Sequence, residues 1–162
     1  MVAGFFTREI VLQVSADRIW KAGILDSHIL LPKLLPNFVA SGELVEGDGG
    51  VGTVKKLTFN EGVKEFRFEK GRVEVLDREN YLVKQAVIEG GLIGLRVKTY
   101  SYEMKLVGGS DAETIGKIRV EYDTLDETPP LSAEEEEQIS GGLFAMIKAI
   151  EGYLLDNPSS YA

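Results

Sequence analysis

The densest group of residues that could bind a charged ligand lies in residues 42–59, GELVEGDGGVGTVKKLTF, where four clustered glycines precede Lys55 and Lys56. A glycine loop that holds phosphate opens a helix, whose N-terminus binds the anion, and often supplies a Lys-Ser or Lys-Thr pair. Here an alternating, β-branched run typical of a strand follows the loop, and neither lysine precedes a serine or threonine. Glu46 and Asp48 would also repel phosphate. The sequence therefore predicts a rigid hairpin connection between two strands.

Other residues that could support catalysis are few. The chain has no cysteine, which excludes thiolate nucleophiles and zinc–cysteine sites. His28 is the only histidine, so no histidine pair can act as acid and base, and we interpret it as a partly exposed helix residue. The glutamates at 134–137 complement the dipole at the start of a predicted helix. We expect neither a metal site nor a cofactor.

Strand patterns occupy most of the chain. Alternating runs rich in β-branched and aromatic residues are separated by turn signals, which predicts an antiparallel meander. The predicted strands are 3–14, 38–46, 52–59, 63–76, 81–88, 95–107 and 114–125. Two short helices are expected between the first two strands, over 16–24 with Ser15 as N-cap, and over 28–35, where Pro32 should kink or end the helix.

A long helix is expected near the C-terminal end. Ser132 and Glu135 have the spacing of a capping box, and the helix should run to about residue 155. A stripe at helical spacing should be buried: Ile139, Leu143, Met146, Ile150 and Tyr153. The sequence thus predicts an α+β fold in one domain over residues 1–162, with a seven-stranded curved antiparallel sheet around the long helix.

Charge and hydropathy limit the possible partners. The formal net charge is −8, and an acidic chain repels nucleic acid and anionic membrane surfaces. No apolar run is long enough to span a bilayer, and the first residues have a strand pattern instead of a leader pattern. We expect a cytosolic protein that binds neither nucleic acid nor membranes, and the lack of cysteine agrees.

Four segments resemble, in the same order, motifs of the plant pathogenesis-related class ten proteins, the family of the major birch pollen allergen. They are ILDSHILLPKLLPN at 24–37, EGDGGVGTVKKLTF at 46–59, VIEGGLIG at 87–94 and AIEGYLLDNP at 149–158. The resemblance covers essentially the whole chain. It implies the helix-grip fold of the START-like superfamily, a large apolar cavity that opens near the long helix, and a monomer.

The predicted architecture favours a cavity on physical grounds as well. Seven strands about 4.8 Å apart form a sheet about 30 Å across, and a helix about 10–12 Å wide cannot fill its concave face. Gly141 and Gly142 lie mid-helix, where each costs up to about 1 kcal/mol relative to alanine. The missing side chains either leave space for a ligand or allow a strand to pack closely, and we favour space.

Strand alternation selects the side chains that face this space. The expected lining is Ile24, Leu31, Phe38, Leu57, Phe59, Phe66, Phe68, Val83, Gln85, Tyr100, Tyr102, Met104, Ile118, Gly142 and Met146. Among these, Gln85, Tyr100 and Tyr102 would orient a ligand in an otherwise apolar pocket. The alternative for each residue is an ordinary place in the core.

Two functions fit such a pocket. The leading hypothesis is a carrier of amphipathic small molecules such as flavonoids, cytokinins, steroids or alkaloid intermediates. The alternative is a cofactor-free enzyme resembling the norcoclaurine synthases, which use a lysine on the last strand, comparable to Lys117. Alternation with Ile118 should turn Lys117 toward solvent, and the long helix lacks the aspartate of those synthases. An enzyme would need an ionisable group with a shifted pKa inside the pocket.

Two further roles known among related proteins are disfavoured. The gate and latch motifs of the abscisic acid receptors are absent from the corresponding turns, FNEGVKEF and IEGGLIGL. A ribonuclease would need an acid–base pair that one histidine cannot form, and the acidic charge opposes RNA binding.

Overall fold

The computed structural model describes residues 3–61, 63, 65–110 and 112–162. The chain begins with a strand and three short helical segments: β1 (Ala3–Leu12), α1 (Ala16–Ile19), η1 (Trp20–Leu25) and α2 (Ser27–Leu34). Six strands follow: β2 (Val39–Glu46), β3 (Val54–Phe59), β4 (Phe68–Asp77), β5 (Leu82–Gly90), β6 (Val97–Ser110) and β7 (Glu113–Thr124). The long helix α3 (Ala133–Asp156) closes the fold.

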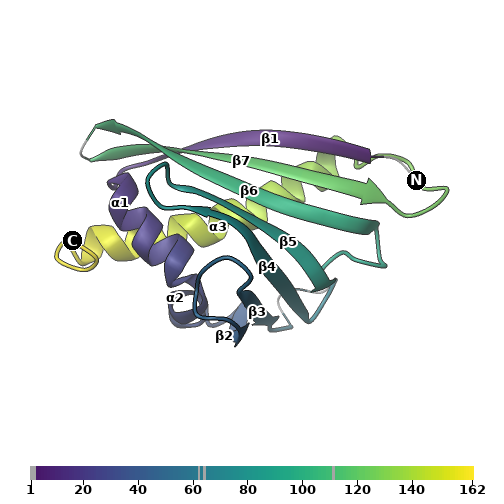
Figure 1. Ribbon diagram of the computed structural model, residues 1–162, viewed down its shortest axis with the longest axis horizontal. Coiled ribbons are helices and arrows are strands. Elements are labelled where there is room, and N and C mark those ends of the chain that lie inside the picture. Colours follow the sequence, from purple (N-terminus) through teal and green to yellow (C-terminus); the bar gives the residue numbers. More distant parts are fainter. Residues whose placement is uncertain (1–2, 62, 64, 111) are drawn as a thin grey trace.

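The strands form one seven-stranded sheet in the order β1-β7-β6-β5-β4-β3-β2, and every neighbouring pair is antiparallel. Six strands follow the chain as a meander, and β1 adds to the free edge of β7. Helix α3 crosses one face of the sheet, and the short helices lie at one end (Figure 1). The predicted helix-grip fold is confirmed, as is the interpretation of the glycine loop as a connection between β2 and β3.

The first predicted helix is divided into two kinds of turn. After α1, the chain widens into the π-helix η1, and the amide of Asp26 donates to the carbonyl of Lys21, five residues back. Ser15 occupies the N-cap position, but its side chain makes no capping hydrogen bond. The predicted N-cap position of Ser15 is therefore confirmed, although its hydroxyl does not cap the helix.

Pro32 lies inside α2, which continues to Leu34. Proline has no N–H for the carbonyl four residues earlier, that of His28. A Cβ on Gly42 of β2 would collide with this carbonyl, so glycine lets β2 lie directly against the helix.

The predicted capping box starts α3. The Glu135 amide donates to Ser132 Oγ at 3.1 Å, and the Ser132 amide donates to Glu135 Oε1 at 3.0 Å. The buried side chains of this helix include Ile147, Ile150 and Leu154 in its second half.

The buried residues form two clusters. One surrounds the short helices and includes Leu12, Ile19, Ile150 and Leu154. The other includes Phe6, Val97, Val120, Tyr122 and Leu131. Helix α3 packs on both, with Ile150 in the first cluster and Ile139 and Leu143 against the second.

Candidate functional site

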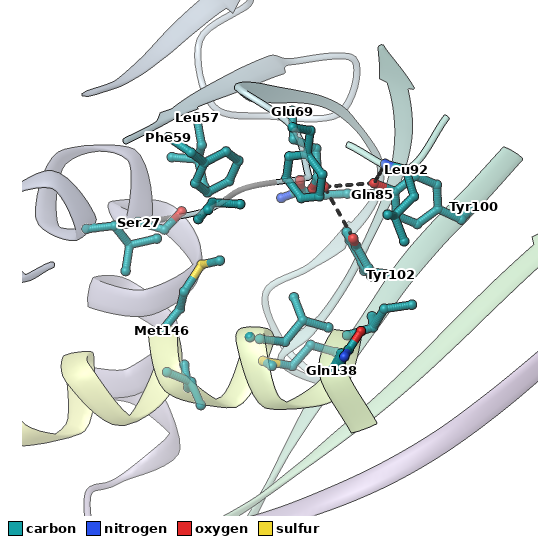
Figure 2. Close-up of a pocket in the computed structure, with 18 of the residues that line it drawn as sticks. Ser27, Leu57, Phe59, Glu69, Gln85, Leu92, Tyr100, Tyr102, Gln138 and Met146 are labelled. Carbon is teal, nitrogen blue, oxygen red and sulfur yellow. Dashed lines mark hydrogen bonds between the residues drawn. The ribbon is translucent and has the colours of Figure 1, made fainter. Parts of the chain in front are cut away.

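A cavity of about 860 Å³ lies between the sheet, the short helices and α3, and residues of both core clusters line it (Figure 2). This volume lies within the range of about 300–1,000 Å³ typical of small-molecule sites. Gly142 contributes to the wall, and a Cβ placed on Gly141 or Gly142 would meet no atom of the described residues within 4 Å. The two glycines therefore leave space, and the alternative of close strand packing is wrong.

Most of the predicted lining is brought together. The residues that reach the cavity are Ile24, Leu31, Leu57, Phe59, Phe66, Val83, Gln85, Tyr100, Tyr102, Met104, Gly142 and Met146. Their contact with a ligand stays a prediction.

The placement of Phe38 and Phe68 in the cavity wall is wrong for the same physical reason. Phe38 lies in the turn before β2 and is 49% exposed, while Val39, 1% exposed, takes the inward position. Phe68 begins β4 and lies under the ammonium of Lys56, which is 5.1 Å from the ring centroid. Each phenylalanine lies at or just before the first residue of its strand, where alternation counted along the predicted strand does not fix the direction of the side chain.

Ile118 is also absent from the cavity wall, although its inward orientation is as predicted. It is 3% exposed on β7, and alternate residues of this strand, including Val120 and Tyr122, are buried as well. Ile118 pairs in register with Met104 of β6, which does line the cavity. The cavity wall thus ends at β6, one strand short of Ile118.

The main polar feature of the cavity is a carboxyl group that the sequence analysis did not identify. Glu69 of β4 accepts hydrogen bonds at Oε2 from the hydroxyls of Tyr100, at 2.9 Å, and Tyr102, at 3.3 Å. The Tyr100 hydroxyl in turn accepts from the amide of Leu92 at 2.9 Å. The two rings meet edge to face with centroids 5.3 Å apart. Figure 2 shows this group, hereafter the Glu69 cluster, on the sheet side of the cavity.

Register and one glycine build the Glu69 cluster. Glu69 pairs with Leu57, and directly opposed residues in an antiparallel pair share a face, so both line the cavity. Gly91 has φ +55°, and a Cβ there would collide with the Tyr100 hydroxyl. Glycine therefore allows this hydroxyl to reach both Glu69 and the Leu92 amide. Alternation counted back from the buried Val73 reaches Glu69, and this was the signal available in the sequence.

The environment perturbs every titratable group of the cluster. Burial raises the pKa of Glu69, and the two tyrosine hydroxyls oppose this rise by donating to the carboxylate. Burial and the nearby carboxylate raise the pKa values of Tyr100 and Tyr102. No lysine or arginine within the described ranges forms an ion pair with Glu69. The cavity thus contains an acid that is harder to ionise than usual.

A second polar contact closes another part of the wall. Arg96 binds Glu135 in a bidentate pair, with Nε–Oε2 at 2.6 Å and Nη2–Oε1 at 3.0 Å, and both residues line the cavity. Hydrogen bonds from Arg96 and the Ser132 amide lower the pKa of Glu135 to about 2. This pair ties the segment before β6 to the first turn of α3.

Lys55 is buried beside the short helices. It is 8% exposed, and its Nζ donates to the carbonyl of Ile24 at 2.7 Å. Burial lowers the pKa of Lys55 to about 8. Burial also lowers the pKa of His28, with a smaller contribution from Lys55. Lys55 shares the inward parity of Leu57 and Phe59, which could have revealed its burial.

Lys117 faces solvent, as predicted. Its side chain is 51% exposed, and its Nζ lies 3.9 Å from Glu9 Oε1 on the neighbouring strand. In the described part of the chain, no group of three acidic, histidine or cysteine side chains is placed to hold a metal. None of the helices described combines the length and apolar character needed to cross a bilayer.

Comparisons with known proteins agree over the whole chain. Residues 1–157 match the model described as the Pathogenesis-related protein Bet v 1 family. The major strawberry allergen Fra a 1-2 of Fragaria ananassa is 38% identical over 162 residues, covering 98% of this chain and 99% of the allergen. The crystal structure of Ara h 8.0201 matches with a TM-score of 0.83 at 30% identity, covering 96% of this chain and 100% of that one.

An enzyme is also among the similar structures. Norcoclaurine synthase from Thalictrum flavum, in complex with dopamine and hydroxybenzaldehyde, matches with a TM-score of 0.75 at 29% identity. The match covers 96% of this chain and 88% of the synthase.

Proposed function

The chain belongs to the Pathogenesis-related protein Bet v 1 family, and we propose that it binds amphipathic small molecules in its internal cavity and releases them unchanged. The observation that carries this proposal is the cavity of about 860 Å³, whose wall is mainly apolar with a few polar groups. Binding comes mainly from apolar burial, at about 25 cal/mol per Å² before ordering costs. Flavonoids, cytokinins, steroids and alkaloid-type metabolites have the required size and mixed polarity.

The second candidate function is a cofactor-free condensation or cyclisation. Glu69 favours it, because an ionisable group with a raised pKa inside the pocket is what acid–base catalysis requires. The similarity to norcoclaurine synthase points the same way. Against it, Lys117 is directed away from the cavity. Any chemistry would therefore depend on Glu69 and its two tyrosines.

One experiment separates the two functions. Purified protein is incubated with a panel of plant metabolites, bound mass is measured by native mass spectrometry, and the supernatant is analysed by chromatography. A chemically unchanged ligand at one per chain supports the carrier. A product that accumulates beyond one equivalent overturns the carrier and supports the enzyme.

We also propose that the protein acts as a monomer in the cytosol. The absence of cysteine supports this location, because secreted domains of this size often carry disulfides. Size-exclusion chromatography with light scattering and subcellular fractionation are the corresponding checks.

A further inference from the structure

We propose that the Glu69 cluster is a binding site for the protonated amine of an amphipathic ligand whose apolar body fills the rest of the cavity. This inference rests on the proposed binding function and narrows its ligand class. The amine site does not follow from the fold or from the apolar lining of the cavity. It depends on one carboxyl group and the arrangement of its hydrogen bonds.

The unsatisfied hydrogen-bonding capacity of the cluster consists of acceptors. Within the described ranges, the donors to Glu69 both reach Oε2, which leaves the lone pairs of Oε1 unused. Although Oε1 has no hydrogen-bond partner among the described residues, it is not a fully buried atom. Because Glu69 lines the cavity, we infer that this oxygen faces the cavity space. The Tyr102 hydroxyl donates to Glu69 and keeps lone pairs to accept another bond.

An alkylammonium group complements this arrangement. It carries three N–H donors and no acceptor, so it can satisfy Glu69 Oε1 and the Tyr102 oxygen together. Its positive charge compensates the buried carboxylate, and the faces of Tyr100 and Tyr102 attract cations. An anionic ligand would meet a carboxylate here, and the amide of Leu92, a nearby donor, is already bonded to Tyr100.

No positively charged side chain described near Glu69 is free to compensate its carboxylate, so a ligand can take this role. On β6 the neighbouring titratable groups are Tyr100 and Tyr102; β3 presents Leu57, and β5 presents the uncharged amide of Gln85. Arg96 and Glu135, which line the cavity from the loop before β6 and from α3, neutralise each other. Glu65 belongs to the segment before β4 and is exposed.

Binding of the cation moves one proton. In the empty cavity burial raises the pKa of Glu69, so its carboxyl group stays protonated to a higher pH than that of an exposed glutamate. A bound ammonium favours the carboxylate, and the proton of Glu69 then passes to solvent. The affinity for an amine should therefore rise with pH until Glu69 is ionised in the free protein. Aliphatic amines, with a pKa of about 10, remain protonated throughout this range.

The test compares two probes that differ only in the polar group, 1-naphthylmethylamine and 1-naphthalenemethanol, by isothermal titration calorimetry between pH 5 and pH 8. For the wild-type protein we expect the amine affinity to rise several-fold across this range and the alcohol affinity to stay constant. For Glu69→Gln at pH 8 we expect a loss of about 10-fold or more for the amine and less than twofold for the alcohol. The matched control is Glu65→Gln, which removes one negative charge from an exposed position on the same cavity.

The outcomes separate this inference from the binding function. If the wild-type protein binds both probes with equal affinity at every pH, the amine site is refuted and the binding function stands. If Glu65→Gln weakens amine binding as much as Glu69→Gln does, a general charge effect replaces the specific site. If neither probe binds, both the site and its premise are wrong. The wild-type comparison needs no variant, so it holds even if Glu69→Gln folds poorly.

Discussion

Replacing Gly142 with leucine should fill part of the cavity without disturbing its walls. A Cβ at this position meets no atom of the described residues within 4 Å, so the new side chain enters the open space of the cavity. The matched control is Gly141→Leu. Gly141, like Gly142, is exposed and has no atom of the described residues within 4 Å of its Cβ position, but it does not line the cavity.

The two effects of this substitution have opposite signs. Leucine is a better helix former than glycine by about 0.5–1 kcal/mol, which raises the Tm of a chain of this size by about 1–4 °C. In the cavity, each ligand CH₂ that loses its place costs about 0.8 kcal/mol. If the leucine excludes two such groups, affinity falls by about 1.6 kcal/mol, which is about tenfold.

The measurements are a thermal unfolding scan of both variants and a calorimetric titration with 1-naphthalenemethanol. We expect both variants to gain a few degrees in Tm, as helix propensity predicts. Only Gly142→Leu should lose affinity, by about tenfold. Equal affinities for Gly141→Leu and Gly142→Leu would refute the assignment of the ligand site to this cavity.

Three further predictions concern the buried charges. Glu69→Gln should be more stable than wild type at pH 8 and equally stable at pH 4, because burial raises the pKa of Glu69 and the native state loses stability as pH rises above about 4.5. Urea unfolding at both pH values measures this, and equal stability at pH 8 would contradict it. The free energy of unfolding of the wild type should rise relative to that of Lys55→Met between pH 8 and pH 10. Burial lowers the pKa of Lys55 to about 8, so in this interval the unfolded chain binds more protons than the native state. Urea unfolding measures this, and parallel stability curves for the two proteins would count against it. Gly91→Ala should weaken binding of 1-naphthylmethylamine, because the new Cβ displaces the Tyr100 hydroxyl. The control Gly94→Ala, at φ +81° with open space around its Cβ, should strain only the backbone. An equal effect of the two substitutions on the amine affinity in calorimetry would argue against the Glu69 cluster as the amine site.

The elements of the fold could be predicted because their signals are local. Turn residues separate alternating runs, and Ser132 with Glu135 marks the start of α3 at the observed position. The π-helical turn of η1 could not be predicted in this way. Its carbonyl at Ile24 is held by Lys55, which lies 31 residues away in the chain.

The residues of the cavity wall could be predicted in those strands whose boundaries could be predicted. Leu57, Phe59 and Met104 lie in strands whose faces the sequence pattern defined, and all three reach the cavity. Before β4 the predicted strand began at residue 63, whereas the observed one begins at Phe68. Alternation counted along one continuous strand from Phe66, which lines the cavity, selects Phe68 and excludes Glu69. Residues 66 and 67 are not part of β4, so this count does not continue into the strand, and the cavity-facing Glu69 was missed.

Glu69 also differs from the apolar residues of the wall in its effect on the free energy of unfolding. At neutral pH a buried carboxyl with a raised pKa lowers the free energy of unfolding, and a glutamine could accept the same two tyrosine hydrogen bonds without that cost. An apolar ligand gains nothing from the charge, whereas a cationic ligand compensates it. The stability lost in the empty cavity would then be recovered on binding, which couples the affinity of the cavity to the charge of its ligand. A neutral carrier would not need this coupling, and an enzyme would use the same carboxyl to move a proton.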